Sequence, residues 1–448
     1  MSKIRVLLLT NRDSDNVGDQ IIEATVISLI EAAFANLGVP REDFEITSRA
    51  AGIISRAYMR SKDPSLLEGA RKEISAADVV VFGGAPLFNY TYQNFYRRTI
   101  TTVELAHEYN VPVLFSSIGV EPFNPSNPKS VALKKALALP VVRQITTRDD
   151  YESLAKYVEG TDTPIAHVSD PAVFSDLVFG RSTAAKPRGA AKHKRIGLVV
   201  TRAEIFKDNG IEFTHDDQQE FWRDTIAELT KRGYDYKLFT TGHFTDEEFL
   251  ESFIKEHGIP AKKARLVVNS PEELIDELVA CDGIIAYRLH ASITSFAYEI
   301  PSVGLSWNFK VPYFYESVGY GERALDHTQW TGVEAVDAIE KALRAGVHKD
   351  EAFLMSVYET LVSGLKGIFA PMSEREVYTA AELRAHIPPY PGTTPAMYRE
   401  KLGNKSRRAN EYHKRKGTQV ELPSTALPHR ILRRAKREWN QRFGRGRG

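Results

Sequence analysis

Short apolar runs recur along the first half of the chain, and helical patterns separate most of them. The runs are Ile4–Thr10, Phe44–Thr47, Val79–Phe82, Val113–Ser116, Gln144–Thr147 and Ile165–Val168. Near-continuous apolar strands that alternate with helices are typical of a parallel sheet covered on both faces. The first half of the chain therefore predicts an α/β domain.

The same pattern starts again near residue 196. Further strands are predicted at Ile196–Thr201, Tyr236–Thr240, Arg265–Val268, Gly283–Ala286 and Ser302–Leu305, with helices near 217–232, 245–257, 271–281 and 291–299. Between the halves, Arg181–Lys194 is rich in Ala, Lys, Gly and Pro and lacks periodicity, as a linker does. We expect two doubly wound parallel-sheet domains, 1–180 and 195–375, that face a cleft. This arrangement resembles the glycosyltransferase B architecture.

The C-terminal residues differ in composition from the rest of the chain. Residues 401–448 contain 15 Lys and Arg against three Glu, whereas the whole chain carries a net charge of +1. Because Pro, Gly, Lys and Arg dominate from 388 onward, we expect a basic, largely mobile tail over 388–448. Within it, residues 428–443 fit a basic amphipathic helix that would bind an anionic membrane surface. The alternative is a solvated or nucleic-acid-binding tail.

Composition also limits the class of protein. The content of 42% hydrophobic and 26% charged residues is ordinary for a soluble globular protein. A single cysteine, Cys281, rules out an internal disulfide and fits a reducing compartment. No run approaches the roughly 18 apolar residues that span a bilayer. We therefore expect a cytoplasmic protein that the tail could hold at the inner face of the plasma membrane. The sequence shows no metal-ligand spacing and no dinucleotide fingerprint, so no metal is predicted.

An Arg and a His stand at the carboxyl end of the predicted strand Gly283–Ala286. Arg288 and His290 lead into a helix of small residues, and both strand ends and helix N-termini favour anionic ligands. Arg offers a bidentate fork to phosphate or carboxylate, and His titrates near neutrality and can transfer a proton. Lys310 lies just beyond the next strand, where it is either a solvated side chain or a phosphate contact.

The first half holds further candidates at its strand ends. Asn16, Gly18 and Asp19 lie between the first strand and its helix. There Asp19 caps the helix, contributes its carboxylate to a site, or does both. Gly83 and Gly84 close another strand, at a point where the backbone turns tightly or approaches a ligand.

Arg148 ends a third strand of the first half. Its side chain either projects toward the other domain as a second anion-binding cation or pairs with Asp149 or Asp150 beside it. Asp170 follows the next strand, where it caps the turn that Pro171 begins or contributes to the same site.

The joint order of these motifs resembles the polysaccharide pyruvyl transferase family over roughly residues 4–320. The motifs are Asn16-Val17-Gly18-Asp19, Gly83-Gly84, Ser117-Ile118-Gly119-Val120-Glu121-Pro122, Thr147-Arg148-Asp149, Asp170-Pro171-Ala172 and Arg288-Leu289-His290, with Lys310 beyond. Two motifs depart from the family pattern. The usual triple glycine reads Gly83-Gly84-Ala85, and the Ser of the usual Arg-Asp-x-x-Ser stands one place late, at Ser153.

The resemblance implies transfer of a pyruvyl group from phosphoenolpyruvate to a sugar of a cell-envelope polysaccharide or its lipid-linked precursor, forming a ketal. Phosphoenolpyruvate is then the donor substrate, and no separate cofactor is expected. The N-terminal domain would take the acceptor and the C-terminal domain the donor. His290 and Asp19 are the expected catalytic residues. The expected substrate contacts are Arg288, Leu289, Arg148, Lys310, Asn16, Gly18, Gly83 and Gly84.

Two other classes of protein would use the same architecture. A nucleotide-sugar glycosyltransferase would show a pyrophosphate site with a uracil or guanine pocket. A non-catalytic glycan-binding relative would keep the fold without the chemistry, and the intact pair of Arg288 and His290 disfavours it.

Overall fold

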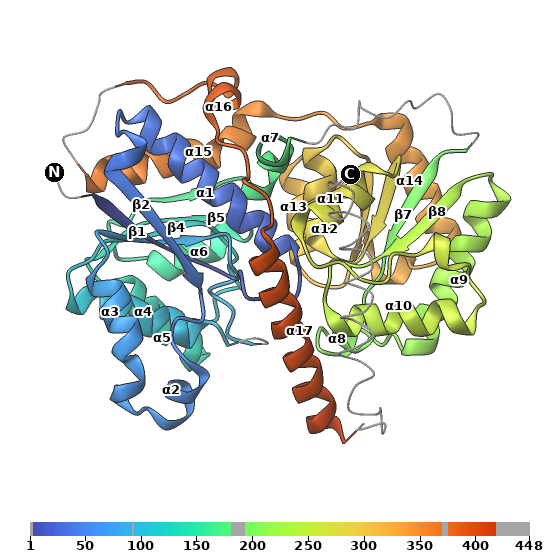
Figure 1. Cartoon of the computed structure of the whole chain (residues 1–448), viewed down its shortest axis with the longest axis horizontal. Coiled ribbons are helices and arrows are strands. Elements are labelled where there is room, and N and C mark those ends of the chain that lie inside the picture. Colours follow the sequence, from blue (N-terminus) through green and yellow to red (C-terminus); the bar gives the residue numbers. More distant parts are fainter. Residues whose placement is uncertain (1–2, 92–93, 181–192, 370–374, 418–448) are drawn as a thin grey trace, which may run out of the picture.

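The computed structural model of the chain describes residues 3–91, 94–180, 193–369 and 375–417. Two parallel sheets lie side by side, each surrounded by helices (Figure 1). This confirms the predicted α/β class and the presence of two sheets. Most of the predicted linker, residues 181–192, lies outside the described residues.

The N-terminal sheet contains six parallel strands in the order β2-β1-β3-β4-β5-β6. Their bounds are β1 Ile4–Thr10, β2 Phe44–Ala50, β3 Val79–Gly83, β4 Val113–Ile118, β5 Val142–Thr147 and β6 Ile165–His167. All six were predicted within a few residues, because apolar strands buried on both faces stand out as continuous runs. The helices of this domain are α1 Gly18–Asn36, α2 Arg56–Ser61, α3 Glu68–Ser75, α4 Tyr96–Glu108, α5 Pro128–Leu137, α6 Tyr151–Val158 and α7 Ser175–Phe179.

The C-terminal sheet contains five parallel strands in the order β11-β10-β9-β7-β8. Their bounds are β7 Arg195–Val199, β8 Asp235–Phe239, β9 Gly283–Ala286, β10 Ser302–Ser306 and β11 Ala324–Asp326. The helices are α8 Glu204–Lys207, α9 His215–Lys231, α10 Phe244–Glu256, α11 Pro271–Val279, α12 Leu289–Ala297, α13 Lys310–Ser317 and α14 Gly332–Ala345. The four helices predicted here are confirmed to within about two residues as α9 to α12.

The strand predicted at Arg265–Val268 is wrong, and β11 was missed. Ala264 makes only an isolated bridge to Leu238 of β8. Beyond it, the N–H of Val268 donates to the Glu247 carboxylate at 3.0 Å instead of to a neighbouring strand. The run therefore contacts β8 only at this bridge, where the N–H of Arg265 donates to the carbonyl of Leu238 at 2.8 Å, and it forms no ladder beyond it. The short β11 occupies the other edge of this sheet.

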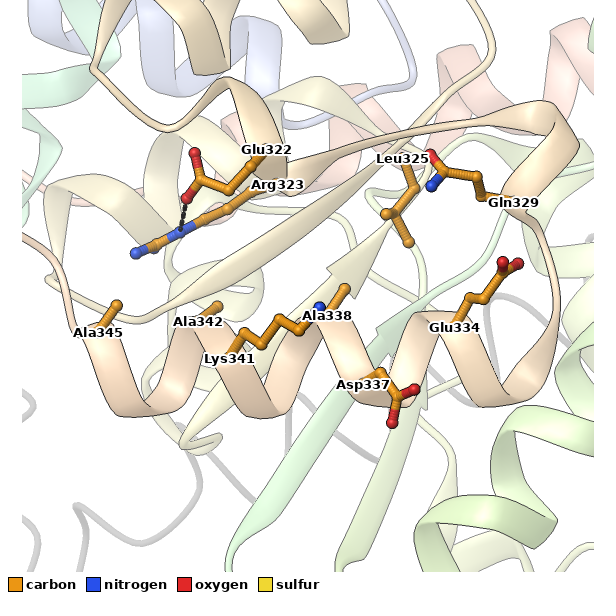
Figure 2. A pocket seen from close by; sticks show the side chains of 10 residues that line it. All are labelled: Glu322, Arg323, Leu325, Gln329, Glu334, Asp337, Ala338, Lys341, Ala342 and Ala345. Atoms are coloured by element: carbon orange, nitrogen blue, oxygen red, sulfur yellow. Dashed lines mark ion pairs between the residues drawn. The ribbon is translucent and has the colours of Figure 1, made fainter.

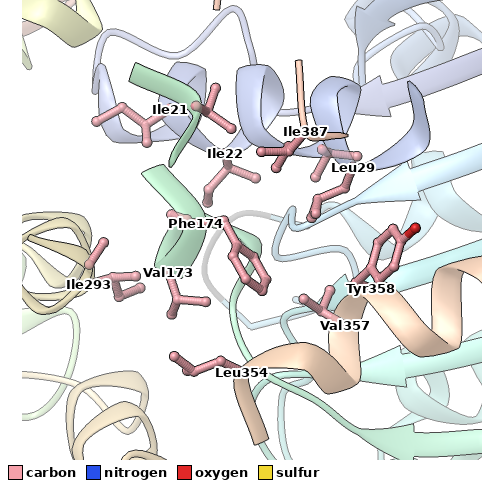
Figure 3. Close-up of a cluster of buried hydrophobic side chains, with 14 of the residues drawn as sticks. Ile21, Ile22, Leu29, Val173, Phe174, Ile293, Leu354, Val357, Tyr358 and Ile387 are labelled. Atoms are coloured by element: carbon pink, nitrogen blue, oxygen red, sulfur yellow. The ribbon is translucent and has the colours of Figure 1, made fainter. Parts of the chain in front are cut away.

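An apolar cluster joins the two domains. Ile21 and Ile22 of α1 point toward the short helix Pro171–Phe174, with Ile293 of α12 on its other side (Figure 3). The helix α15 (Glu351–Ile368) follows α14 but packs on α1, β4 and β5 of the N-terminal domain.

The segment after α15 is more ordered than the sequence suggested. It forms α16 (Ala380–His386) and the 22-residue helix α17 (Pro395–Lys416). The prediction of a mobile tail from 388 is wrong for α17, because Thr394 caps the helix, Pro395 occupies its first turn and a stripe of its side chains is buried. The predicted amphipathic helix 428–443 lies outside the described residues. Within the described ranges, the search for a helix long and apolar enough to cross a membrane found none.

Candidate functional site

The turn after β9 places Arg288 and His290 at the start of α12. Arg288 is the N-cap residue of this helix. Its Nε and Nη2 atoms both donate to Oδ2 of Asp246, at 2.9 and 2.6 Å. Asp246 lies in the first turn of α10, and its side chain has no solvent exposure. This two-point contact fixes the plane of the guanidinium group while 13% of the Arg288 side chain stays exposed.

His290 contacts the loop that follows β1 in the other domain. Its Nδ1 lies 2.9 Å from Nδ2 of Asn16. Because an amide nitrogen only donates, Nδ1 is the acceptor, and the ring proton is assigned to Nε2. The side-chain oxygen of Asn16, Oδ1, in turn accepts from the N–H of Gly18 at 3.1 Å. A Cβ atom on Gly18 would lie 2.3 to 2.5 Å from atoms of His290, so only glycine fits there. The structure thus brings His290 against two residues of the Asn16-Val17-Gly18-Asp19 motif, which lies in the other half of the sequence.

The surroundings of His290 keep its ring neutral. Burial, together with the positive charges of Arg148, Lys310 and Arg288, lowers the pKa of His290 to about 3. At neutral pH the ring therefore carries no charge in the ligand-free protein. An anion among the same cations would cancel their effect and raise the pKa of His290.

Arg148 is almost completely buried and forms an ion pair with Asp170. The pairing with Asp149 or Asp150 considered from the sequence is not the one formed. Asp170 also accepts from the N–H of Ala172 at 2.8 Å, so it both caps the turn and holds the arginine. Among the described residues, Nε of Arg148 is buried without a hydrogen-bond partner. A buried donor of this kind costs free energy unless a ligand or water satisfies it.

Asp19 lies in the first turn of α1 and is buried. Burial raises the pKa of the Asp19 carboxyl group, while hydrogen bonds from Ser14 and Asn11 and the charges of Arg148 and Lys401 oppose that rise. The carboxylate therefore lies within electrostatic reach of the Arg148 guanidinium group, as a site role requires.

Lys310 is the first residue of α13, and its side chain is partly exposed. Burial lowers the pKa of the Lys310 ammonium group, and Asp149 opposes this change. The interactions with Asp149 and Arg148 connect Lys310 to the strand ends of the N-terminal domain, so this candidate also lies where the domains meet.

The remaining predicted residues have packing explanations. Gly84 has a φ of +62°, and a Cβ there would lie 2.4 Å from Ile22, while a Cβ on Gly83 would lie 3.0 Å from Val26. Both glycines therefore let α1 approach the end of β3. Leu289 packs against the apolar cluster between the domains.

Sequence reasoning missed a second cluster beside Arg288. Nη1 of Arg202, three residues after the end of β7, lies 2.8 Å from Oγ1 of Thr245 and 3.8 Å from Oδ1 of Asp246. It also lies 3.3 Å from Nδ1 of His243. Arg202 directly follows a strand that was predicted, so the rule for strand ends could have found it. No local signal marked Asp246, because it sits within an ordinary helix start.

Two pockets have linings that do not include the candidate site residues described above. One of about 370 Å³ lies beside β11 and α14 and includes Glu322, Arg323, Asp337 and Lys341 (Figure 2). The other, of about 1080 Å³, lies between α1, β2 and α17. The lining of neither includes Arg288, His290 or Lys310. Over the described ranges, a search for groups of three or more His, Cys, Asp or Glu residues that could hold a metal ion found none.

Comparisons with solved structures support the fold. A protein from Listeria monocytogenes, provisionally assigned as a UDP-N-acetylglucosamine 2-epimerase, is 12% identical over 84% of this chain and 100% of its own, with a TM-score of 0.56. The UDP-GlcNAc 2-epimerase of Methanocaldococcus jannaschii is 16% identical over 82% of this chain and 99% of its own, with a TM-score of 0.50. At such identities the likeness shows the fold alone, which is of the glycosyltransferase B kind.

The sequence comparisons identify the family. A search of curated proteins finds no significant match. The profile of the family described as polysaccharide pyruvyl transferase matches residues 16–308, from the Asn16 that contacts His290 to the residue before Phe309. The match covers more than half of the chain and contains Gly18, Arg148, Arg288 and His290. The protein therefore belongs to the polysaccharide pyruvyl transferase family.

Proposed function

We propose that the protein transfers the pyruvyl group of phosphoenolpyruvate to two hydroxyls of one sugar in a cell-envelope polysaccharide or its lipid-linked precursor, forming a cyclic ketal. The observation that carries this proposal is the convergence of Arg148, Lys310, Arg288 and neutral His290 on one place between the domains. Phosphoenolpyruvate carries a phosphate and a carboxylate, and cations held in fixed positions suit such a ligand.

The cations divide into two groups that match the two anionic groups of the donor. Arg288 and Arg202 are held around Asp246 in the C-terminal domain. Arg148 comes from the N-terminal domain, and its buried Nε has no hydrogen-bond partner among the described residues. We assign the phosphate to the C-terminal group and the carboxylate to Arg148, with Lys310 close to both. A donor bound in this way would contact residues of both domains.

The reaction begins with protonation of the methylene carbon of phosphoenolpyruvate, which creates an oxocarbenium-like centre at C2. One sugar hydroxyl adds to C2, and the C2–O bond to phosphate breaks as a second hydroxyl closes the ring. The two hydroxyl protons balance the proton gained by the methyl group and the one carried by the released hydrogen phosphate. His290 is the proposed proton donor, and the negative charge of the bound donor would favour its protonated form by offsetting the positive charges around it, although burial of the ring still lowers its pKa.

Asp19 is the proposed residue that orients the attacking hydroxyl. Its carboxylate lies at the start of α1, beside the loop that contacts His290. The acceptor would then approach from the N-terminal domain and the donor from the C-terminal domain. Exclusion of water from this junction would strengthen the charge contacts and limit hydrolysis of the donor.

The test is incubation of the full-length protein with phosphoenolpyruvate and a panel of lipid-linked and aryl glycosides. We expect one glycan to gain the mass of a pyruvate ketal with release of one phosphate for each ketal. Transfer of a sugar from a nucleotide sugar, with no phosphoenolpyruvate consumed, would assign the protein to the glycosyltransferase class instead. Glycan binding without any product would mark a non-catalytic relative.

The location of the reaction is part of the proposal. We place it in the cytoplasm, where phosphoenolpyruvate is made, at the inner face of the plasma membrane where a lipid-linked acceptor would lie. The basic residues beyond 417 would provide an electrostatic attachment, since each basic residue near an anionic surface contributes about 1 kcal/mol. Co-sedimentation with anionic but not neutral liposomes at low salt is the expected result.

A further inference from the structure

The helix α17 lies between the two domains and contacts both of them (Figure 1). It lies outside residues 16–308, which match the family profile. Its sequence is strongly basic, yet Tyr398, Lys401, Leu402, Lys405 and Ala409 are buried along one side. Two lysines on the buried face of a helix require specific partners, because an unpaired buried charge is costly.

On the C-terminal domain, Lys405 is the anchor of α17. Its side chain has no solvent exposure, and Nζ donates to Oε1 of Glu247 at 2.5 Å and to Oδ1 of Asn269 at 2.9 Å. Tyr398, two turns earlier, donates its hydroxyl to Glu273 at 3.3 Å. Toward the other end, His413 lies 2.8 Å from Glu248. These contacts fix both the rotation of α17 and its position along its own axis.

On the N-terminal domain, α17 contacts the loop that follows β1. Nζ of Lys401 donates to the backbone carbonyl of Ser14. Arg408, two turns later, donates to the carbonyl of Asp13 and lies 3.5 Å from the carboxylate of Asp15. The same loop rests on the C-terminal domain, where the N–H of Val17 donates to the carbonyl of Thr241 at 2.8 Å. The loop is therefore held from two sides.

Ser14 connects these contacts of α17 to the candidate site. Its hydroxyl accepts from the N–H of Asn16 at 3.1 Å and donates to the carboxylate of Asp19. Asn16 in turn contacts His290. A series of hydrogen bonds, linked through the covalent structure of Ser14 and Asn16, thus connects Lys401 to the residues proposed to transfer the proton and orient the hydroxyl.

A stabilising role alone does not explain this arrangement. Replacement of a buried ion pair by apolar side chains is often neutral or stabilising, so buried charges are weak evidence for stability. Burial also lowers the pKa of Lys401 to about 7, so its charged form is disfavoured at this position. The hydrogen bond from Lys401 to a loop carbonyl is therefore better explained by a role in fixing the position of the loop.

We propose that Lys401 is a positioning residue that acts through Ser14 to hold Asn16 and Asp19 against His290, with Lys405 anchoring α17 for this purpose. This inference rests on the proposed function for its kinetic readout. It extends the site to a helix outside the family match and makes the C-terminal helix part of the machinery that organises the reaction.

The test compares K401M, K401R and the exposed control K414M in the full chain. Lys414 lies on the same helix and is solvent-exposed. We expect K401M to lower kcat by about 10- to 100-fold, the scale of a small misplacement of reacting groups, with little change in KM for the donor. K401R should recover part of the loss, and K414M should match the wild type. Wild-type kcat in a folded K401M protein would overturn the inference.

Two further measurements separate positioning from simple stability. Because the Lys401 charge is disfavoured in the folded state, the wild type should gain stability relative to K401M as pH rises from about 7 to 10.5. A fall in kcat without a fall in melting temperature at neutral pH is therefore expected. S14A removes the hydroxyl that links the loop to Asn16 and Asp19. Because both variants disturb the same set of contacts, the effects of S14A and K401M on kcat should be strongly non-additive in the double variant. Additive effects would contradict the series.

An NMR measurement that does not depend on enzyme turnover tests this inference separately from the proposed function. The imidazole nitrogen signals of His290, assigned by their absence in H290Q, should shift in K401M and stay unchanged in K414M. If the wild type forms no ketal with any acceptor, the proposed function fails while this shift still tests the positioning. If ketal forms but the His290 signals are the same in wild type and K401M, the positioning inference fails alone.

Discussion

Nδ1 of His290 and Nδ2 of Asn16 lie 2.9 Å apart, although 274 positions separate them in the chain. The contact joins the two domains at the residue proposed to transfer the proton. It also selects the tautomer that carries its proton on Nε2, which leaves that nitrogen available for a substrate.

Removal of this contact should weaken catalysis more than binding. N16A leaves the His290 ring without its fixed tautomer, and a lost hydrogen bond of about 1 kcal/mol corresponds to a roughly fivefold fall in kcat. Nitrogen NMR of the ring should show a mixed tautomer population in N16A. An unchanged tautomer and unchanged turnover would show that Asn16 does not fix the tautomer of the His290 ring.

Gly18 should tolerate no side chain. A Cβ at this position would lie 2.3 to 2.5 Å from His290, so G18A must displace the ring or the loop. We expect at least a tenfold loss of phosphate release in a protein that still folds. Gly69 of α3 is the matched control, because a Cβ there meets nothing within 4 Å. G69A should be fully active, and equal activity of the two variants would contradict the packing described here.

The sequence predicted the scaffold better than the partners within the site. Strand ends such as Arg148 and Arg288 could be found because apolar runs mark the strands, and the carboxyl edge of a parallel sheet collects ligand-binding residues. The pairing of Arg148 with Asp170 and of Arg288 with Asp246 could not be predicted. Each pair joins separate segments and depends on tertiary packing.

Local composition explains the main error in the fold. The segment from 388 onward is rich in residues that disfavour a packed core, so α17 was not expected. Its order comes from specific contacts, such as Lys405 with Glu247, whose partners lie far away in sequence. The apolar periodicity of this helix is weak, because two of its five buried side chains are lysines.

Donor affinity should depend on the fork of Arg288 and not only on its charge. R288A should weaken phosphoenolpyruvate binding by about 2 to 3 kcal/mol, the scale of a charge-assisted hydrogen bond. R288K keeps the charge but loses the planar fork, so we expect an intermediate affinity. Calorimetric titration measures all three proteins, with the exposed Arg223 changed to Ala as a control. Wild-type affinity in folded R288A would remove Arg288 from the donor site.

Donor binding should take up protons through His290. The pKa of His290 is about 3 in the ligand-free protein because of burial and the positive charges of Arg148, Lys310 and Arg288. An anionic donor offsets those charges and raises this pKa, so the ring gains a proton on binding and affinity falls as pH rises.

Calorimetry in two buffers of different ionisation enthalpy, near pH 7, measures this uptake. H290Q is the control, since protons exchanged by the donor's own phosphate remain in that variant. Equal proton uptake by wild type and H290Q would show that His290 does not become charged.

The most direct test of the proposed chemistry follows the oxygen that bridges C2 and phosphorus in phosphoenolpyruvate. The donor is labelled at that oxygen with a heavy isotope, and mass spectrometry of the phosphate and of the glycan locates the label after reaction. Addition at C2 breaks the C–O bond, so all of the label should leave with phosphate and none should appear in the ketal. Label retained in pyruvate or in the glycan would mean that the P–O bond breaks, and would contradict pyruvyl transfer by this protein.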